Sequence, residues 1–467
     1  MRFRRLALSL IVAFATPVAL ANTLSEIYEL ALQNDPQLRA ARAAFLAGQE
    51  AKNIGRAALL PQISATGEYE ELETNGSSTT VLNQNAIFSR RGHTDTDSHG
   101  YYLNLSQPIF DLPAWFSFQQ GKALSEQARL QFAADQQSLI LRSADAYFEV
   151  LRARENLETA LAQEKAIQRQ LEQTKERFEV GLLPITDVHE AQAAYDNARV
   201  NTLEARGALD IAFEGLTVLT GEPHQQLAGL VPNFPVVQPE PVNREDWVQF
   251  ALQNNFSLQA ARYQRDAADE NAKSKKYEHA PTLTGTLSYY DDQTDSEFRG
   301  TDQYGFSSTP SATDQEGHAI GLQLTVPIFT GGLVSAERRQ AFQQYVQADE
   351  TFIGAQRNTV QQARSQHLLV VTNTERVKAR KLAITSAESA LEATQAGYEA
   401  GTRNIVDVLV AQQNLYQASR DYANARYDYI GSLLRLKEVA GQLSPEDIYQ
   451  LNAWLDPGIN VTKAGVQ

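Results

Sequence analysis

Cysteine is absent from all 467 residues. The chain therefore forms no disulfide, and it lacks the cysteine that carries the lipid of a bacterial lipoprotein. Long apolar runs are also missing beyond the first 21 residues, where no window approaches the ~18 residues of a transmembrane helix. A role within a membrane would therefore require β-strands, whose sequence signal is a weak alternation.

Basic residues are outnumbered, with 41 Lys and Arg against 56 Asp and Glu, a formal net charge of −15. Without the three arginines near the start of the chain, the formal charge becomes −18. Nucleic acid is disfavoured as a partner, because no basic stripe exists to replace its counterions. An acidic balance suits an interior that attracts cations, and it equally suits an ordinary soluble surface.

Sequence signatures of catalysis are missing as well. No glycine-rich phosphate loop, nucleophile elbow or HExxH motif is present. His93 and His99 could bind an adventitious metal, although a solvated histidine in a loop is the commoner case. The histidines show no paired metal-ligand spacing: His93, His99, His189, His224, His279, His318 and His367. We expect a protein that is not an enzyme and that carries no cofactor and no metal.

Residues 1–21 have the pattern of a secretory signal peptide. Arg2, Arg4 and Arg5 precede an apolar core, and Ala19-Leu20-Ala21 is a small-x-small cleavage site. An uncleaved anchor is the alternative, but the apolar run is too short to span a bilayer. The mature protein should begin at Asn22.

The rest of the chain is a tandem duplication. Residues 31–42, ALQNDPQLRAAR, match residues 251–262, ALQNNFSLQAAR, at eight of twelve positions. An offset of about 220 residues that persists along the chain indicates two copies of one structural unit. We predict these divisions: a first repeat at 22–221, a proline-rich equatorial crossover at 222–243, a second repeat at 244–441, and a C-terminal equatorial segment and tail at 442–467, disordered after Pro457.

Each repeat begins with a helix-forming segment, residues 24–59 or 244–278, which a proline ends. Alternation with a period of two then predicts a pair of strands of about ten residues each. The hairpins are expected at about 62–107 and 282–326, with polar loops at 72–98 and 291–316 between the strands.

One face of each predicted strand is apolar and the other is small and polar, as in a water-lined membrane barrel. A soluble β-sandwich alternates in the same way. Four strands cannot close a barrel, because small barrels begin at about eight. A membrane barrel therefore requires several copies of the chain.

Long helices follow the strands. Residues 114–178 and 334–398 are almost free of glycine and contain no proline, and shorter helices are predicted to return at 185–219 and 405–439. Between the long and returning helices lie ERFEVGLLPITDVHE and AGYEAGTRNIVDVLV, each with a glycine that can reverse the chain. We predict two helical hairpins whose tips meet at one end of the molecule.

The duplicated helix–strand–strand–helix unit, the VPIF before the second long helix and the sequence GTRNIVDVLVAQQNLY resemble the TolC family. This resemblance extends over essentially the whole mature chain. It implies a mainly α fold with a membrane β-barrel: a homotrimer with a twelve-stranded barrel in the outer membrane lipid and an α-helical tunnel through the periplasm. It further implies an exit duct for efflux or type I secretion, docked to a periplasmic adaptor protein and an inner-membrane pump.

The resemblance also implies roles for residues at the tips. In the family, the aspartate that matches Asp187 bonds the tyrosine that matches Tyr398 within one subunit. With the threonine that matches Thr186, it also meets the arginine that matches Arg403 in another subunit, and these links hold the periplasmic end closed. Asp407 matches an aspartate that lines the channel entrance, whereas Val410 stands where the family has a second aspartate. The tips that contact the adaptor match these residues: Val180, Gly181, Leu182, Ala400, Gly401 and Thr402.

Other interpretations remain open from the residues alone. Thr186, Asp187 and Asp407 lie in the first turn of a returning helix, where they could simply cap free N–H groups. The chain could also be a periplasmic coiled-coil scaffold without a pore, or an adaptor. An adaptor would normally have one hairpin between β-rich domains, not two equal copies.

Overall fold

The computed structural model describes residues 21–83, 86–302 and 305–463, so almost all of the predicted signal peptide lies outside it. Within these ranges no helix is both long enough and apolar enough to cross a membrane. The chain divides into two compact units, of which one contains residues 45–129 and 260–353 and the other contains the remainder. The helices are α1 (Leu24–Asn34), α2 (Pro36–Ala57), α3 (Leu112–Glu179), α4 (Ile185–Thr220), α5 (Arg244–Asn254), α6 (Phe256–Lys276), α7 (Leu333–Glu399), α8 (Ile405–Val439) and α9 (Pro445–Asn452). The strands are β1 (Gln62–Asn83), β2 (Ala86–Phe110), β3 (Gln226–Leu230), β4 (Thr282–Asp302), β5 (Gly305–Thr325) and β6 (Leu455–Thr462).

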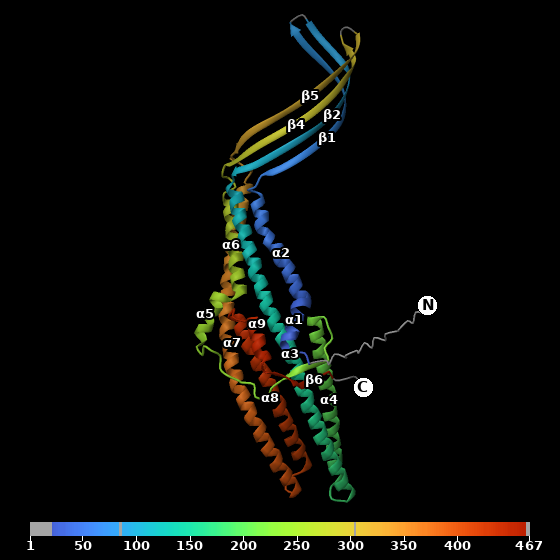
Figure 1. Cartoon of the computed structure of the whole chain (residues 1–467), viewed down its shortest axis with the longest axis vertical. Coiled ribbons are helices and arrows are strands. Elements are labelled where there is room, and N and C mark those ends of the chain that lie inside the picture. Colours follow the sequence, from blue (N-terminus) through green and yellow to red (C-terminus); the bar gives the residue numbers. More distant parts are fainter. Residues whose placement is uncertain (1–20, 84–85, 303–304, 464–467) are drawn as a thin grey trace, which may run out of the picture. The chain divides into compact units, whose positions relative to one another are not determined.

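Strands β1, β2, β4 and β5 form one antiparallel sheet in the order β1-β2-β4-β5 (Figure 1). The predicted loops at 72–98 and 291–316 are wrong, because the strands continue through most of both segments. Backbone hydrogen bonds of a ladder do not depend on alternating side chains. The polar Thr, Ser and Asp residues therefore extend the strands beyond the amphipathic part that the sequence revealed.

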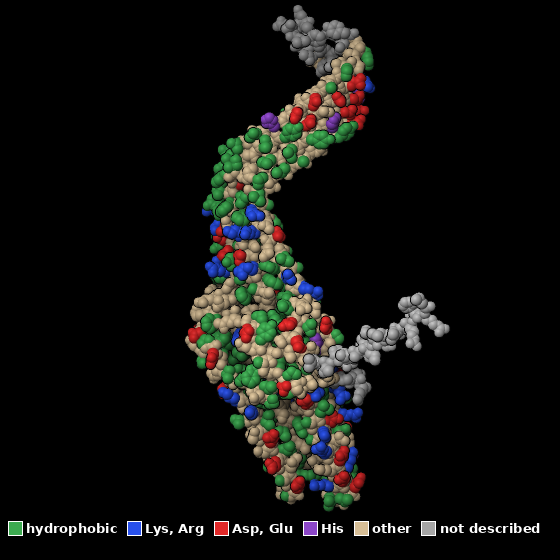
Figure 2. Space-filling view, in the orientation of Figure 1, with side chains coloured by type: hydrophobic (Ala, Val, Ile, Leu, Met, Phe, Trp, Pro, Cys, Tyr) green, Lys and Arg blue, Asp and Glu red, His purple; other side chains and the backbone are tan. Residues whose placement is uncertain are grey.

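The register places the apolar residues of neighbouring strands on one face. Ile63 lies opposite Leu105, Leu103 opposite Tyr289, and Gly285 opposite Leu322. Direct partners in an antiparallel ladder point to the same side of the sheet. Figure 2 shows this hydrophobic surface on the half of the sheet nearer the helices, with acidic side chains toward the distal end of the strands.

The opening segment of each repeat is two helices, not the single helix expected at 24–59 and 244–278. Asp35 separates α1 from α2, and Asn255 separates α5 from α6. The Leu38 backbone N–H donates to Asp35 Oδ2 at 2.9 Å, and Leu258 N–H donates to Asn255 Oδ1 at 2.8 Å. Each side chain thus caps the following helix, which makes a break between the helices stable.

The long helices agree with the prediction. α3 has 68 residues and α7 has 67, about 100 Å each at 1.5 Å per residue. α4 and α8 return from them antiparallel, so that the two hairpins lie side by side with both tips at one end (Figure 1).

A continuous hydrophobic core occupies the middle of the larger unit, where the hairpins meet the proline-rich crossover. β3, from the crossover, pairs with β6, from the C-terminal segment. Asn22 joins β3 through a parallel bridge, and Tyr147 donates from its hydroxyl to the Ala228 carbonyl at 2.6 Å. The prediction of disorder after Pro457 is wrong through Thr462, because β6 includes these residues. Pro457 is tolerated since β6 has a neighbour on one side only and the pairing with β3 is interrupted between Asp456 and Asn460.

Candidate functional site: the tips of the two helical hairpins

Both hairpins reverse direction through the same backbone motif. Gly181 and Gly401 have φ angles of 78° and 73°, the left-handed region that only glycine enters without cost. Leu182 N–H donates to the Arg177 carbonyl at 2.9 Å, and Thr402 N–H donates to the Gly397 carbonyl at 2.9 Å. These bonds satisfy carbonyls at the ends of α3 and α7 in the Schellman arrangement, and the chain reverses at the two glycines as predicted.

The first tip presents apolar side chains to solvent. Val180 is 70% exposed and Leu182 is 72% exposed. Both aliphatic side chains are next to the Gly181 turn.

Asp407 is a helix cap at the second tip. The Asn404 side chain accepts a hydrogen bond from the Asp407 backbone N–H at 2.9 Å, and Asp407 Oδ2 accepts one from Asn404 N–H at 3.3 Å. Arg403 Nη1 lies 3.8 Å from Asp407 Oδ2. The structure therefore supports the capping interpretation for Asp407, and it pairs Arg403 with Asp407 in the single chain.

Asp187 has a different environment in the corresponding turn of the first hairpin. α4 begins after Pro184, whose side chain cannot accept a hydrogen bond, so this helix has no side-chain cap. Asp187 Oδ1 accepts a hydrogen bond from the Thr186 hydroxyl at 3.4 Å. Within the described part of the chain, Asp187 makes no ion pair.

Tyr398 lies where the two hairpins meet. It packs against a small hydrophobic cluster drawn from three helices, namely Ile167, Ala198, Ile405 and Leu409. The Arg177 guanidinium lies over its ring, with Cζ 5.3 Å from the ring centre. The Tyr398 hydroxyl is buried and has no hydrogen-bond partner among the described residues. The structure therefore shows no hydrogen bond between Tyr398 and Asp187 of the same chain, the pair that the resemblance implies.

Sequence reasoning missed two residues at the tips, Arg177 and Gly397. A Cβ atom on Gly397 would lie 2.9 Å from Arg403 Cγ, so the absence of a side chain there lets Arg403 fold across the end of α7. The contact of Arg177 with Tyr398 joins α3 to α7, and no local pattern could reveal it because it depends on how the hairpins pack.

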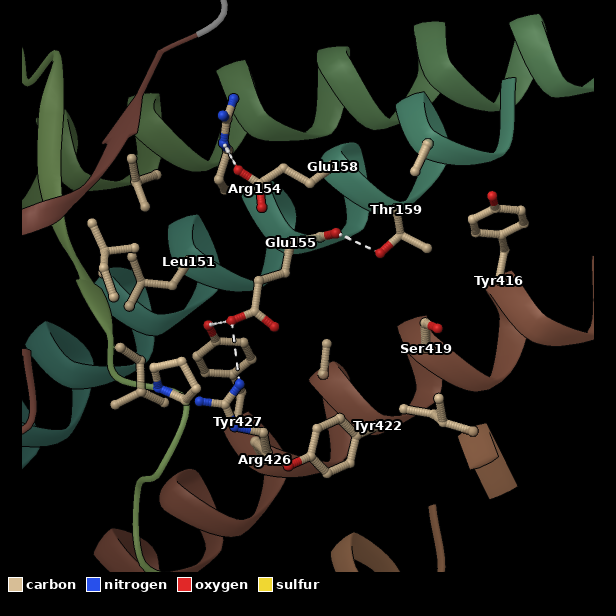
Figure 3. A pocket seen from close by; sticks show the side chains of 18 of the residues that line it. Leu151, Arg154, Glu155, Glu158, Thr159, Tyr416, Ser419, Tyr422, Arg426 and Tyr427 are labelled. Carbon is tan, nitrogen blue, oxygen red and sulfur yellow. Dashed lines mark hydrogen bonds and ion pairs between the residues drawn. The ribbon is translucent and has the colours of Figure 1, made fainter. Parts of the chain in front are cut away.

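Further along the hairpins, away from the tips, a hollow lies between α3 and α8 beside β6 (Figure 3). The Tyr427 hydroxyl donates to Glu155 Oε1 at 2.5 Å, and Arg426 Nη1 lies 3.6 Å from the same oxygen. Arg426 Nη2 also donates to the Val231 carbonyl at 3.0 Å. Burial raises the pKa of Tyr427, so the phenol stays protonated and keeps donating. This cluster fixes α3, α8 and the crossover to one another near the hydrophobic core.

Comparison with known proteins agrees with this geometry. The family model described as "Outer membrane efflux protein" matches residues 27–222 and 247–442, one stretch in each repeat. The chain belongs to this family. It is 38% identical over 440 residues to the outer membrane protein TolC of Vibrio cholerae, covering 93% of this chain and 94% of that protein. It is 30% identical to the proteases secretion protein PrtF of Dickeya chrysanthemi, covering 100% and 98% of the two chains. The crystal structure of the CusC channel superposes with a TM-score of 0.72 at 17% identity, covering 90% of this chain and 92% of that one.

Family and fold together identify an outer-membrane channel that extends into the periplasm and serves as an exit duct for efflux or secretion. The resemblance to the TolC family is confirmed, and the scaffold and adaptor interpretations are not favoured. The family is one of channels and not of enzymes. The roles predicted for the individual tip residues remain predictions.

Proposed function

We propose that three copies of the chain form one duct, with a shared barrel and a tunnel that is closed at the hairpin tips until a partner docks. The open sheet is the observation that supports this proposal. One chain contributes four strands, and β1 and β5 each have a free edge. A free edge cannot face lipid, because its N–H and C=O groups would lack hydrogen bonds. Three copies supply twelve strands and pair every edge.

Light scattering on the detergent-solubilised protein tests the assembly. We expect a single species with the mass of a trimer, which heat converts to monomer on electrophoresis. A monodisperse monomer that retains its strand content would contradict the proposal.

The proposed partners are a periplasmic adaptor at the tips and an inner-membrane pump that delivers the substrate. The adaptor would contact the two turns, where the exposed side chains of Val180 and Leu182 flank Gly181, and Ala400, Gly401 and Thr402 form the second turn. Leu182→Asp should weaken cross-linking between duct and adaptor without altering the trimer. Leu203→Asp, on another exposed leucine, on α4 and away from the tip, is the matched control.

The proposed gate consists of Thr186, Asp187, Tyr398 and Arg403, with Asp407 as the acidic ring at the entrance. In this proposal, assembly exchanges the Arg403–Asp407 pair of the single chain for a link between Arg403 and Asp187 of adjacent copies. The Asp187 carboxylate supports this exchange, since it has no cation partner among the described residues of the single chain and Arg403 of an adjacent copy would supply one.

Relatives bear names from both efflux and protein secretion, so the substrate class needs a direct test. A deletion strain should be compared with its parent for secreted proteins and for drug sensitivity. Loss of a secreted protein at unchanged drug sensitivity would assign the duct to type I secretion, and the converse result would assign it to efflux.

A further inference from the structure

We propose that a hollow between the end of α6 and the start of α7 binds the phosphodiester headgroup of an anionic phospholipid. The hollow has a volume of about 730 Å³ and lies entirely within the smaller unit. The proposal rests on the outer-membrane location of the channel. It adds a lipid partner on the periplasmic side of the barrel.

Cationic side chains surround the hollow. It is lined by Asp269, Ala272, Lys273, Lys276, Arg338, Arg339, Phe342, Gln343 and Tyr345. Lys273 is neutralised by Asp269 and Glu270, with N–O distances of 2.8 and 2.7 Å. Lys276, Arg338 and Arg339 make no ion pair within the described ranges, so three positive charges face the hollow in a chain of net charge −15. Such a cluster is complementary to a phosphate.

Aromatic side chains form the other part of the wall. Phe342 is 53% exposed, and its ring centre lies 6.4 Å from that of Tyr345. At the end of α6, Lys276 Nζ lies 5.4 Å from the centre of the Tyr277 ring, which stacks on Phe116. Aromatic rings beside Lys and Arg are typical of the interface between lipid and water.

The hollow is close to the sheet along the chain. α6 ends at Lys276 and β4 begins at Thr282, while β5 ends at Thr325 and α7 begins at Leu333. Arg338 is five residues into α7, about 8 Å along its axis. Between β5 and α7, Ile328 and Phe329 are 89% and 86% exposed. The hollow is therefore at headgroup depth when the apolar sheet is in the bilayer, and these two side chains can contact acyl chains.

The direction in which the hollow faces follows from the side chains of α7. Arg338, Phe342 and Tyr345 recur at helical spacing along one stripe. A second stripe, about 160° away, consists of the uncharged residues Gln340, Gln344, Gln347 and Thr351. The uncharged stripe suits a water-filled lumen, and the basic aromatic stripe suits the membrane side. Figure 2 shows Lys and Arg side chains gathered just beneath the hydrophobic surface of the sheet, on the face that bears that surface.

Native mass spectrometry of the full-length assembly, titrated with phosphatidylglycerol or phosphatidylcholine, tests the site. We expect phosphatidylglycerol to remain bound and phosphatidylcholine to dissociate. Arg338→Gln/Arg339→Gln should weaken phosphatidylglycerol binding roughly ten- to thirtyfold, since two charges contribute to the attraction. Lys275→Gln is the matched control, because Lys275 is on the same turn as Lys276 but is paired with Glu278 and Glu337 outside the hollow.

Several results would overturn the proposal. Equal weakening by Lys275→Gln would mean general surface attraction. Binding of inorganic phosphate alone with the same affinity would mean a site for a soluble anion. The intact assembly could also show no preference for phosphatidylglycerol while the double variant assembles in lower yield. That result would mean that a second copy of the chain covers the hollow. Single-channel conductance of the same samples separates this question from the duct proposal, because loss of lipid preference with normal channels refutes the lipid site alone.

Discussion

The Arg177 guanidinium lies over the ring of Tyr398, with its Cζ atom 5.3 Å from the ring centre. Arg177 belongs to the end of α3 and Tyr398 to the end of α7, so this cation–π contact ties one hairpin to the other within a single chain. The contact uses the face of the ring and leaves the hydroxyl free. The two parts of Tyr398 can therefore serve two different links, and substitutions can separate them.

Replacement of Arg177 by Gln should loosen the tips. An exposed cation–π contact contributes about 0.5–1 kcal/mol, and the proposed assembly contains three copies. We expect higher conductance in planar bilayers, with an intermediate effect for Arg177→Lys, which retains the charge. If Arg177→Gln channels conduct like the wild type while the trimer is intact, the contact plays no part in closure.

The double change Arg403→Ser/Tyr398→Phe tests the links implied by the resemblance. It removes the cation proposed to meet Asp187 of an adjacent copy, and it removes the buried hydroxyl while the ring remains for Arg177. A charge-assisted hydrogen bond contributes roughly 1.5–3 kcal/mol, so the increase in conductance should exceed that of Arg177→Gln. Unchanged conductance at matched salt would place the gate elsewhere.

Asp407→Asn separates charge from capping at the entrance. An amide oxygen can still accept the Asn404 N–H, so the capping box can persist while the negative charge is lost. We expect weaker cation selectivity and weaker block by multivalent cations in single-channel recordings. Selectivity equal to that of the wild type would show that Asp407 acts only as a helix cap.

Adjacent residues on β2 provide a matched test of the sheet faces. Leu103 shares a face with Ile63, Leu283 and Leu322, whereas Asn104 shares the opposite face with Thr66, Thr284 and Gln323. Leu103→Arg should destabilise the membrane-inserted protein by about 2–4 kcal/mol near the midplane, while Asn104→Arg should be tolerated. Urea titrations in lipid bilayers would measure the difference, and equal effects would reject this assignment of the faces.

Acidification should loosen the attachment of the N-terminal segment. His224 is buried, its Nε2 lies 2.7 Å from the Thr220 hydroxyl, and its Nδ1 lies 3.4 Å from Asn22 Oδ1. Burial lowers the pKa of His224, although Glu222 opposes the shift. Since the folded state favours the neutral imidazole, this stability is complete above the ordinary histidine pKa of about 6.5 and decreases as the pH falls below it.

Hydrogen exchange around Asn22, corrected for the intrinsic rate at each pH, measures this effect. Exchange should accelerate on acidification in the wild type and change less in His224→Gln, which has no titratable ring. The same acceleration in both proteins would assign the pH dependence to other groups.

Local signals in the sequence predicted the reversals and the lengths of the helices in the two hairpins, because a glycine at φ near 75° acts within a few residues. The full length of the strands was not predictable in this way. Residues such as Thr94 and Thr294 are held by ladder hydrogen bonds, which leave no alternating pattern in the sequence. The breaks at Asp35 and Asn255 were both missed, although Pro36 follows the first, and the Arg177–Tyr398 contact depends on tertiary packing. The amphipathic part of the fold could therefore be predicted from the sequence, whereas the contacts between its elements could not.

The strand order β1-β2-β4-β5 has a consequence for the origin of the duct. The two repeats join through β2 and β4, and the proposed copies join through β5 and β1, so both junctions link the last strand of one hairpin to the first strand of the next. A protein encoding one repeat would need six subunits to complete the same wall. Fusion of two repeats lowers the order of the assembly reaction from six to three, so the closed ring persists at far lower subunit concentrations. Fusion also allows the two halves to diverge. The returning helices already differ, because α4 begins after Pro184 without a side-chain cap whereas Asn404 caps α8.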